Sequence, residues 1–198
     1  MATADLFDRL RLLTGAGDPS SDFDLNPDLR PEGRRLRGAA VLIALQETPT
    51  EISLYLTKRS SHLAHHPGQI AFPGGKIDPD DTDATAAALR EAEEEIGLPR
   101  DHVEVIGTLA SHETVTGFDV TPVIGRIMRP FTPVPEIGEV DEVFTVPFAH
   151  VADPACYIVE QRFFRGVPRQ FYTVPYGPYY IWGATARILH ALAMRLAS

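Results

Sequence analysis

Apolar residues recur along this chain with two different spacings, and these spacings predict where its helices and strands lie. Residues 6–13 have helical spacing, whereas residues 16–34 are rich in Gly, Pro, Asp and Ser and are typical of an extended connector. Apolar runs at residues 41–45 and 52–56 predict two strands joined as a hairpin. Alternation in the second run predicts that its leucines point inward and that Tyr55 points outward.

The most clearly marked helix is predicted over residues 84–96. Its apolar stripe recurs every four residues and should face the core. Asp83 is suited to cap the start, Gly97 to end the helix in the left-handed conformation, and Pro99 cannot continue it. Both ends are therefore set by local chemistry.

The rest of the chain is predicted to contain both strands and a helix. Further strands are predicted at residues 103–109, 120–127, 143–146 and 171–174, followed by an amphipathic helix over residues 184–196. The elements interleave without a strict βαβ repeat, which predicts an α/β (α+β) fold with a mixed β-sheet packed between α-helices. We expect an N-terminal helix and connector over residues 1–34 and a single domain over residues 35–198.

Three acidic side chains crowd the end of the predicted 84–96 helix. Glu91, Glu94 and Glu95 are three and four positions apart, so their carboxylates share one side, and Arg90 is the only basic residue within helical reach. Negative charge is also unfavourable in the last turns of a helix. Hard divalent cations such as Mg²⁺ prefer carboxylate oxygens, so a metal site fits this pattern better than a solvated charged face. Glu93 is expected to point away as an ordinary surface residue.

Two motifs in this region resemble a known family. Residues 90–98, Arg-Glu-Ala-Glu-Glu-Glu-Ile-Gly-Leu, are similar to the second half of the Nudix box, and Gly75 matches its first position. The intervening glutamate of the box is replaced by Asp81, with one extra residue before Arg90. Residues 56–75 resemble the stretch that distinguishes coenzyme A diphosphatases among Nudix proteins. Ala64 stands where those enzymes usually carry a basic residue.

The resemblance implies a Nudix fold and specific roles for these residues. Glu91 and Glu95 would hold Mg²⁺ or Mn²⁺, with the Gly75 carbonyl as a further ligand, and Glu94 would complete the metal shell or accept a proton from water. Arg90 would orient the glutamates. The matching positions for substrate binding are Arg59, Ser60, Gly68, Gln69 and Phe72, to which we add His66. A downstream acid, Glu142 or Glu139, could bind metal or serve as base.

The implied activity is hydrolysis of the diphosphate linkage of coenzyme A or its derivatives, giving 3′,5′-ADP and a phosphopantetheine fragment. A Nudix hydrolase of ADP-ribose or a dinucleoside polyphosphate would keep the same metal chemistry and remains an alternative. A non-catalytic nucleotide-binding module is the alternative from a different class. Such a module usually lacks one or more of the box glutamates, whereas this chain keeps Glu91, Glu94 and Glu95.

Composition narrows the range of partners. The 198 residues are 44% hydrophobic, enough for one substantial core, and carry a formal net charge of −9. That charge disfavours nucleic-acid or anionic-membrane binding, because both rely on large basic surfaces. The single cysteine, Cys156, cannot form an internal disulfide, and no signal or membrane-spanning run is recognisable, so a cytoplasmic protein is expected. The resemblance adds a weak expectation of a homodimer.

Overall fold

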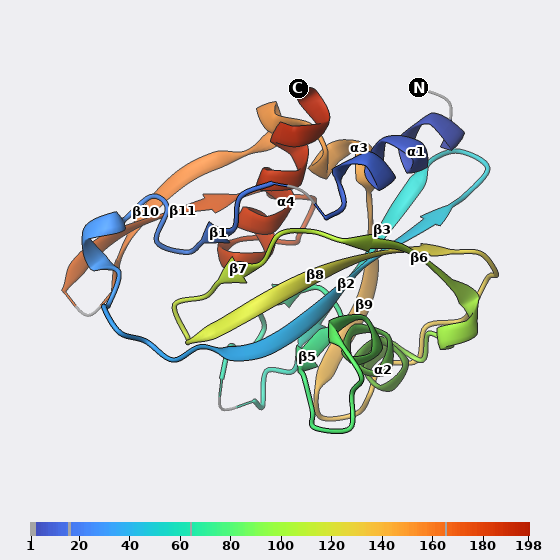
Figure 1. The fold of residues 1–198 in the computed structure, drawn as a ribbon, viewed down its shortest axis with the longest axis horizontal. Helices are drawn as coiled ribbons and strands as arrows, with labels where there is room; N and C mark the ends of the chain where they lie inside the picture. The colour runs from blue at the N-terminus through green and yellow to red at the C-terminus, as the bar shows by residue number, and fades with distance from the viewer. Residues whose placement is uncertain (1–2, 16, 64, 165) are drawn as a thin grey trace.

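A mixed β-sheet lies between helices on both of its faces in the computed structural model of the chain, which describes residues 3–15, 17–63, 65–164 and 166–198. Helix α2 covers one face, and α1, α3 and α4 lie on the other (Figure 1). The predicted fold class is confirmed. In the described part of the chain no helix is long and apolar enough to cross a membrane.

The elements follow one another with short connections. The helices are α1 (Thr3–Leu13), α2 (Ala84–Ile96), α3 (Phe148–Val151) and α4 (Gly183–Ala197), and the short 3-10 turns are η1 (Pro27–Leu29), η2 (Arg100–His102) and η3 (Pro154–Cys156). The strands are β1 (Ser20–Ser21), β2 (Arg37–Glu47), β3 (Ile52–Arg59), β4 (Ile70–Ala71), β5 (Gly74–Lys76), β6 (Val103–Thr108), β7 (His112–Glu113), β8 (Phe118–Ile127), β9 (Val140–Pro147), β10 (Ile158–Phe164) and β11 (Val167–Thr173).

Strand β2 is the centre of the main sheet. It pairs antiparallel with β3 and β5 and parallel with β8, and β9 extends the sheet beyond β3. The predicted β2–β3 hairpin is confirmed, with Leu45 opposite Leu54. Strands β10 and β11 form a separate hairpin that packs beside α4 (Figure 1). The pairing of β5 with β2 is what brings the Gly-Gly segment under α2.

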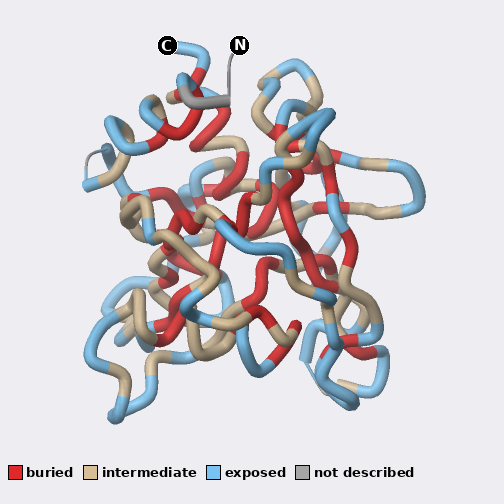
Figure 2. The backbone as a smooth tube through the Cα atoms, turned by 90° about the vertical axis from the view of Figure 1, so that its right-hand side faces the viewer, coloured by how far each residue is buried: buried red, intermediate tan, exposed pale blue. Residues whose placement is uncertain are grey.

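Both faces of the sheet are buried, which corrects the expected orientation of Tyr55. Leu54 and Leu56 enter the core shared with α1 and α4, whereas Tyr55 is 8% exposed and packs with Leu42 in the core under α2. Buried chain accordingly runs through the centre of the molecule (Figure 2). A strand covered on both faces cannot show the simple alternation from which an outward Tyr55 was predicted.

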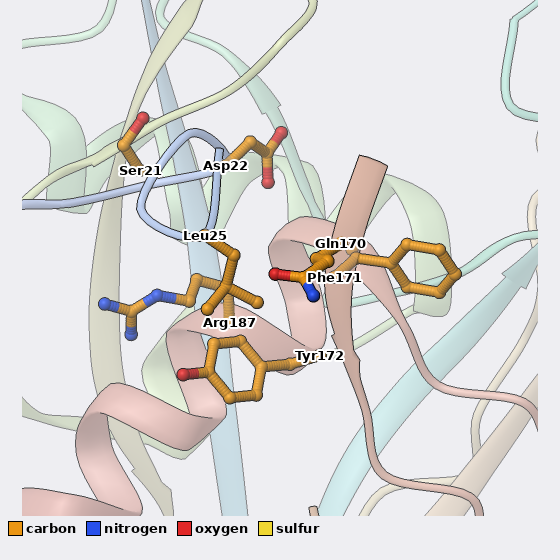
Figure 3. A pocket seen from close by; sticks show the side chains of 8 residues that line it. Ser21, Asp22, Leu25, Gln170, Phe171, Tyr172 and Arg187 are labelled. Carbon is orange, nitrogen blue, oxygen red and sulfur yellow. The ribbon is translucent and has the colours of Figure 1, made fainter. Parts of the chain in front are cut away.

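The N-terminal helix and connector pack onto this body. Leu6, Phe7 and Leu10 of the predicted helix are buried in the core with α4. The connector adds β1, parallel to β7, and its Asn26 exchanges two hydrogen bonds of 2.8 Å with the Gln170 backbone. Figure 3 shows Asp22 and Leu25 of the connector facing Tyr172 and Arg187 across a cavity of about 20 Å³. Such a cavity holds no more than about one water molecule, so this contact is structural.

Candidate active site

Helix α2 has the predicted caps, and they fix which residues reach its C-terminal end. The Asp83 carboxylate accepts a hydrogen bond from the Ala86 amide at 2.8 Å, and Gly97 ends the helix at φ 69°. Ala88, Ala92 and Ile96 are buried against the sheet. Glu91 and Glu95 therefore lie beside the sheet edge, whereas the Glu94 side chain is 56% exposed.

The two glycines of β5 let the backbone approach those glutamates closely. The Gly74 amide donates a hydrogen bond to Glu95 Oε2 at 3.1 Å. A Cβ on Gly75 would lie 2.4 Å from Glu91 Oε1, and one on Gly74 would lie 2.5 Å from the Ala40 carbonyl oxygen. A side chain at either position would displace its neighbours, so glycine is required here.

Arg90 joins the acidic groups around the helix. Its guanidinium donates two hydrogen bonds to the Asp81 carboxylate, at 3.0 and 2.8 Å, and one each to Glu91 and Glu94 at 3.0 Å. These contacts support the positioning role expected of Arg90. Asp81 thus anchors the arginine in spite of the altered spacing, and Arg90 lowers the pKa of Asp81 to about 2.

Burial and like charge act together on the inner glutamates. Burial, opposed by the Gly74 amide and reinforced by the charge of Glu91, raises the pKa of Glu95 to about 7. Burial also raises the pKa of Glu91, opposed by Arg90. The Glu139 carboxylate adds to the rise at both residues. These acids are held where a cation would stabilise their ionised forms.

The structure separates the two candidates for the downstream acid. Glu142 lies opposite Lys58 in the β3–β9 register and accepts a hydrogen bond from the Tyr179 hydroxyl at 2.6 Å. It shares its strand face with Phe144, which enters the core on the side away from α2. Glu139 instead interacts with Glu91 and Glu95. Glu139 precedes the strand and escapes its alternation, and both residues stay candidates for the additional acid.

Arg59 supplies positive charge near the inner glutamates. It ends β3 next to the Glu139 segment, and the Ser60 amide donates to the Glu139 carbonyl oxygen at 2.8 Å. The charge of Arg59 lowers the pKa of Glu95. Its Nε atom is buried and has no hydrogen-bond partner within the described part of the chain. A buried guanidinium nitrogen without a partner is suited to an anionic ligand.

The other predicted substrate residues fall into two groups. Ser60 and Phe72 are 2% and 3% exposed, and Phe72 belongs to the core cluster. His66, Gly68 and Gln69 lie in the loop before β4, where His66 Nδ1 is 2.9 Å from Gln69 Oε1. Ala64 lies outside the described residues.

The donor set fits a divalent metal. Within the described residues no three acidic, histidine or cysteine side chains already converge as metal ligands, and Arg90 engages Glu91 and Glu94. Glu91 and Glu95 nevertheless offer hard carboxylate oxygens, and Glu139 is close enough to shift the pKa of both. Mg²⁺ or Mn²⁺ held by these groups would remove the mutual repulsion that burial strengthens.

This arrangement, a mixed sheet between helices with a glutamate-bearing helix against a glycine pair, is that of a diphosphate-cleaving hydrolase. The NUDIX domain family model matches residues 35–156. The uncharacterized Nudix hydrolase NudL of Escherichia coli O7:K1 is 42% identical to this chain over 172 residues. The aligned residues cover 87% of this chain and 89% of that relative. The protein of the same name from Shigella boydii serotype 4 has the same identity and coverage. The crystal structure of the Nudix hydrolase RenU from M. smegmatis has a TM-score of 0.50 and 28% identity, covering 62% of this chain and 83% of RenU.

The chain therefore belongs to the Nudix family, and it is a pyrophosphohydrolase. Nudix hydrolases generally use divalent metals such as Mg²⁺ or Mn²⁺.

Proposed function

We propose that this protein hydrolyses the diphosphate linkage of coenzyme A or a CoA derivative, giving 3′,5′-ADP and a phosphopantetheine fragment. The observation that carries the proposal is the position of Arg59. This residue belongs to the segment resembling coenzyme A diphosphatases, and its buried, unpartnered Nε lies where its charge influences Glu95. A substrate phosphate would complete its hydrogen bonding.

Each residue of the site has a distinct part in the proposed reaction. Glu91 and Glu95 would hold Mg²⁺ or Mn²⁺, with the Gly75 carbonyl as a further ligand, and the metal would supply charge neutralisation at the phosphates. Arg90, fixed by Asp81, keeps Glu91 in place. Arg59 binds a phosphate oxygen and orients the linkage.

Water is the nucleophile. Its oxygen forms a bond to phosphorus as the bridging P–O bond breaks, and a carboxylate accepts its proton. Glu139 is our candidate for this base, because it is exposed and interacts with both inner glutamates. Glu94 is less suited, since Arg90 engages its carboxylate.

The test is turnover of CoA, acetyl-CoA, ADP-ribose and diadenosine polyphosphates with Mg²⁺ or Mn²⁺, comparing wild type with Glu95→Gln. Glu93→Gln is the matched control, because it makes the same change on the same helix at a residue paired only with Arg100. We expect CoA to be preferred, Glu95→Gln to be inactive and the control to be active. Preference for ADP-ribose would keep the site and refute the CoA assignment, and binding without turnover would indicate a binding module.

A further inference from the structure

A second cavity lies on the face of the sheet away from α2. It has a volume of about 440 Å³ and is lined by Lys58, Pro67, Gly68, Gln69, Ile70, Glu142, Pro178, Tyr179, Tyr180 and Trp182. Of these, Gly68, Gln69 and Glu142 were named as candidate site residues from the sequence. The cavity is large enough for a nucleoside-sized group, since ligand pockets start at roughly 300 Å³.

Three aromatic rings form one wall of this cavity, and their neighbours hold them in place. Tyr179 stacks on Phe144 with ring centroids 3.6 Å apart. The Tyr180 hydroxyl donates to Glu160 at 2.8 Å. Trp182 packs its ring against Phe171 with centroids 5.3 Å apart. A preformed aromatic wall is suited to stacking against a flat base at little entropic cost.

The polar groups of the cavity are chiefly unused donors. No ion pair or hydrogen bond joins the Lys58 ammonium to any described residue, although Glu142 lies directly opposite in the strand register. Glu142 is instead engaged by the Tyr179 hydroxyl. The Gln69 amide oxygen contacts His66, so its NH₂ group remains available, as does the Trp182 indole N–H. One free ammonium beside amide and indole donors favours a ligand that carries an anionic group and ring nitrogens.

Lys58 and Arg59 lie where β3 ends, so the cavity and the catalytic face are adjacent at this end of the sheet. Lys58 and Arg59 are consecutive in β3, so their side chains point to opposite faces of the sheet. The Arg59 amide donates to the Gln69 carbonyl oxygen at 2.9 Å, and the Gly68 amide donates to the Arg59 carbonyl oxygen at 3.0 Å. An elongated substrate that crosses this edge of the sheet would contact Arg59 with its diphosphate and Lys58 with a group beyond it.

We propose that this cavity binds the nucleoside end of the substrate, which is a purine nucleoside with a phosphate on its ribose. The base stacks on Trp182 and Tyr180, and Lys58 contacts the ribose phosphate. The inference rests on the proposed function and adds the means by which the 3′-phosphate of CoA is recognised. Lys58 is then the residue that distinguishes CoA from diphosphates lacking that phosphate.

The kinetic test compares CoA with 3′-dephospho-CoA in wild type and in Lys58→Gln. A lost charge-assisted contact lowers kcat/KM for CoA by roughly 10- to 100-fold, whereas kcat/KM for dephospho-CoA should change by less than about twofold. Arg129→Gln, which removes a positive charge paired with Asp101, is the control and should leave both values unchanged. An equal loss for both substrates, or no loss for either, would overturn the role of Lys58.

Binding gives an independent readout, because Trp182 is the only tryptophan in the chain. We would titrate the Glu95→Gln variant with 3′,5′-ADP, 5′-AMP and 4′-phosphopantetheine and follow its fluorescence. Quenching by 3′,5′-ADP, weakened about tenfold or more for 5′-AMP and absent for phosphopantetheine, is expected. Quenching by phosphopantetheine alone would assign the cavity to the other end of the substrate. If wild type does not hydrolyse CoA, the proposed function fails, and this titration still decides what the cavity binds.

Discussion

Replacing Gly75 by alanine should disable the enzyme while preserving its fold. The added Cβ would lie 2.4 Å from Glu91 Oε1 and 2.5 Å from its Cδ, whereas ordinary contact begins at 3.4 Å. The carboxylate must therefore move by about 1 Å, and a misplacement of that size in an active site costs on the order of 10²-fold in rate. Gly75 does not need a left-handed φ, so the substitution introduces no backbone strain of that kind.

The assay measures kcat for diphosphate hydrolysis at saturating Mg²⁺, together with the thermal unfolding midpoint. Gly38→Ala is the matched control, because Gly38 lies in the adjoining strand and its Cβ would meet only the flexible end of Ile77 at 3.3 Å. Glu91→Asp tests the same point without touching the backbone, since it withdraws the carboxylate by about one methylene and should also lower kcat. Wild-type kcat in Gly75→Ala, with its fold intact, would refute the argument that Glu91 must lie against Gly75.

Three further predictions follow from the charges around α2. Asp81→Asn removes the negative charge and replaces one of the two oxygens that accept from Arg90 with an NH₂ group, and it should lower kcat by about tenfold. The neighbouring Asp80→Asn should have no effect, and equal kcat in both variants would contradict the anchoring role. Glu139→Gln should lower kcat by roughly 10²- to 10⁴-fold, and an unchanged kcat would exclude it as the base. Because the folded pKa of Glu95 is raised from 4.5 to about 7, the native state binds more protons than the unfolded state between these values, and its stability falls as pH rises across them. Urea unfolding in EDTA measures this effect. The free energy of unfolding should fall by roughly 3 kcal/mol between pH 4.5 and 7 because of Glu95, and Glu95→Gln should abolish this fall. Equal pH dependence in both proteins would contradict the raised pKa.

The parts of the fold predicted correctly are those with local signals. Helix α2 was placed over its observed range because Asp83, Gly97 and the alanine stripe act within a few residues of one another. The longer strands of the main sheet, β2, β3, β6, β8 and β9, were likewise found from their apolar runs. Strands β1, β4, β5 and β7 were not predicted, because each is two or three residues long and exists only through its pairing partner. The seven-residue strand β10 was also missed.

The site shows the same division between local and long-range information. The grouping of Glu91, Glu94 and Glu95 follows from helical periodicity, and so does the Arg90–Glu94 pair, which is present at 3.0 Å. Glu139 and Glu142 could not be separated from sequence, because their difference depends on where β9 begins and which face it presents. The only signal in the sequence for the start of β9 was that the alternation of apolar and polar residues breaks before Val140.

The aromatic cavity was missed for a related reason. Tyr179, Tyr180 and Trp182 lie more than 100 residues from Lys58 in sequence, and only the packing of the segment before α4 brings them together. Phe72 stands in a motif that resembles a substrate-binding stretch, and its side chain packs in the core.

The most direct test of the central claim is the ratio of kcat/KM for CoA to that for ADP-ribose, measured with Mg²⁺ or Mn²⁺ and with the products identified by mass. We predict a preference for CoA of at least about tenfold, with 3′,5′-ADP and a phosphopantetheine fragment as products. A ratio below one, or cleavage that leaves the diphosphate intact, would contradict the account.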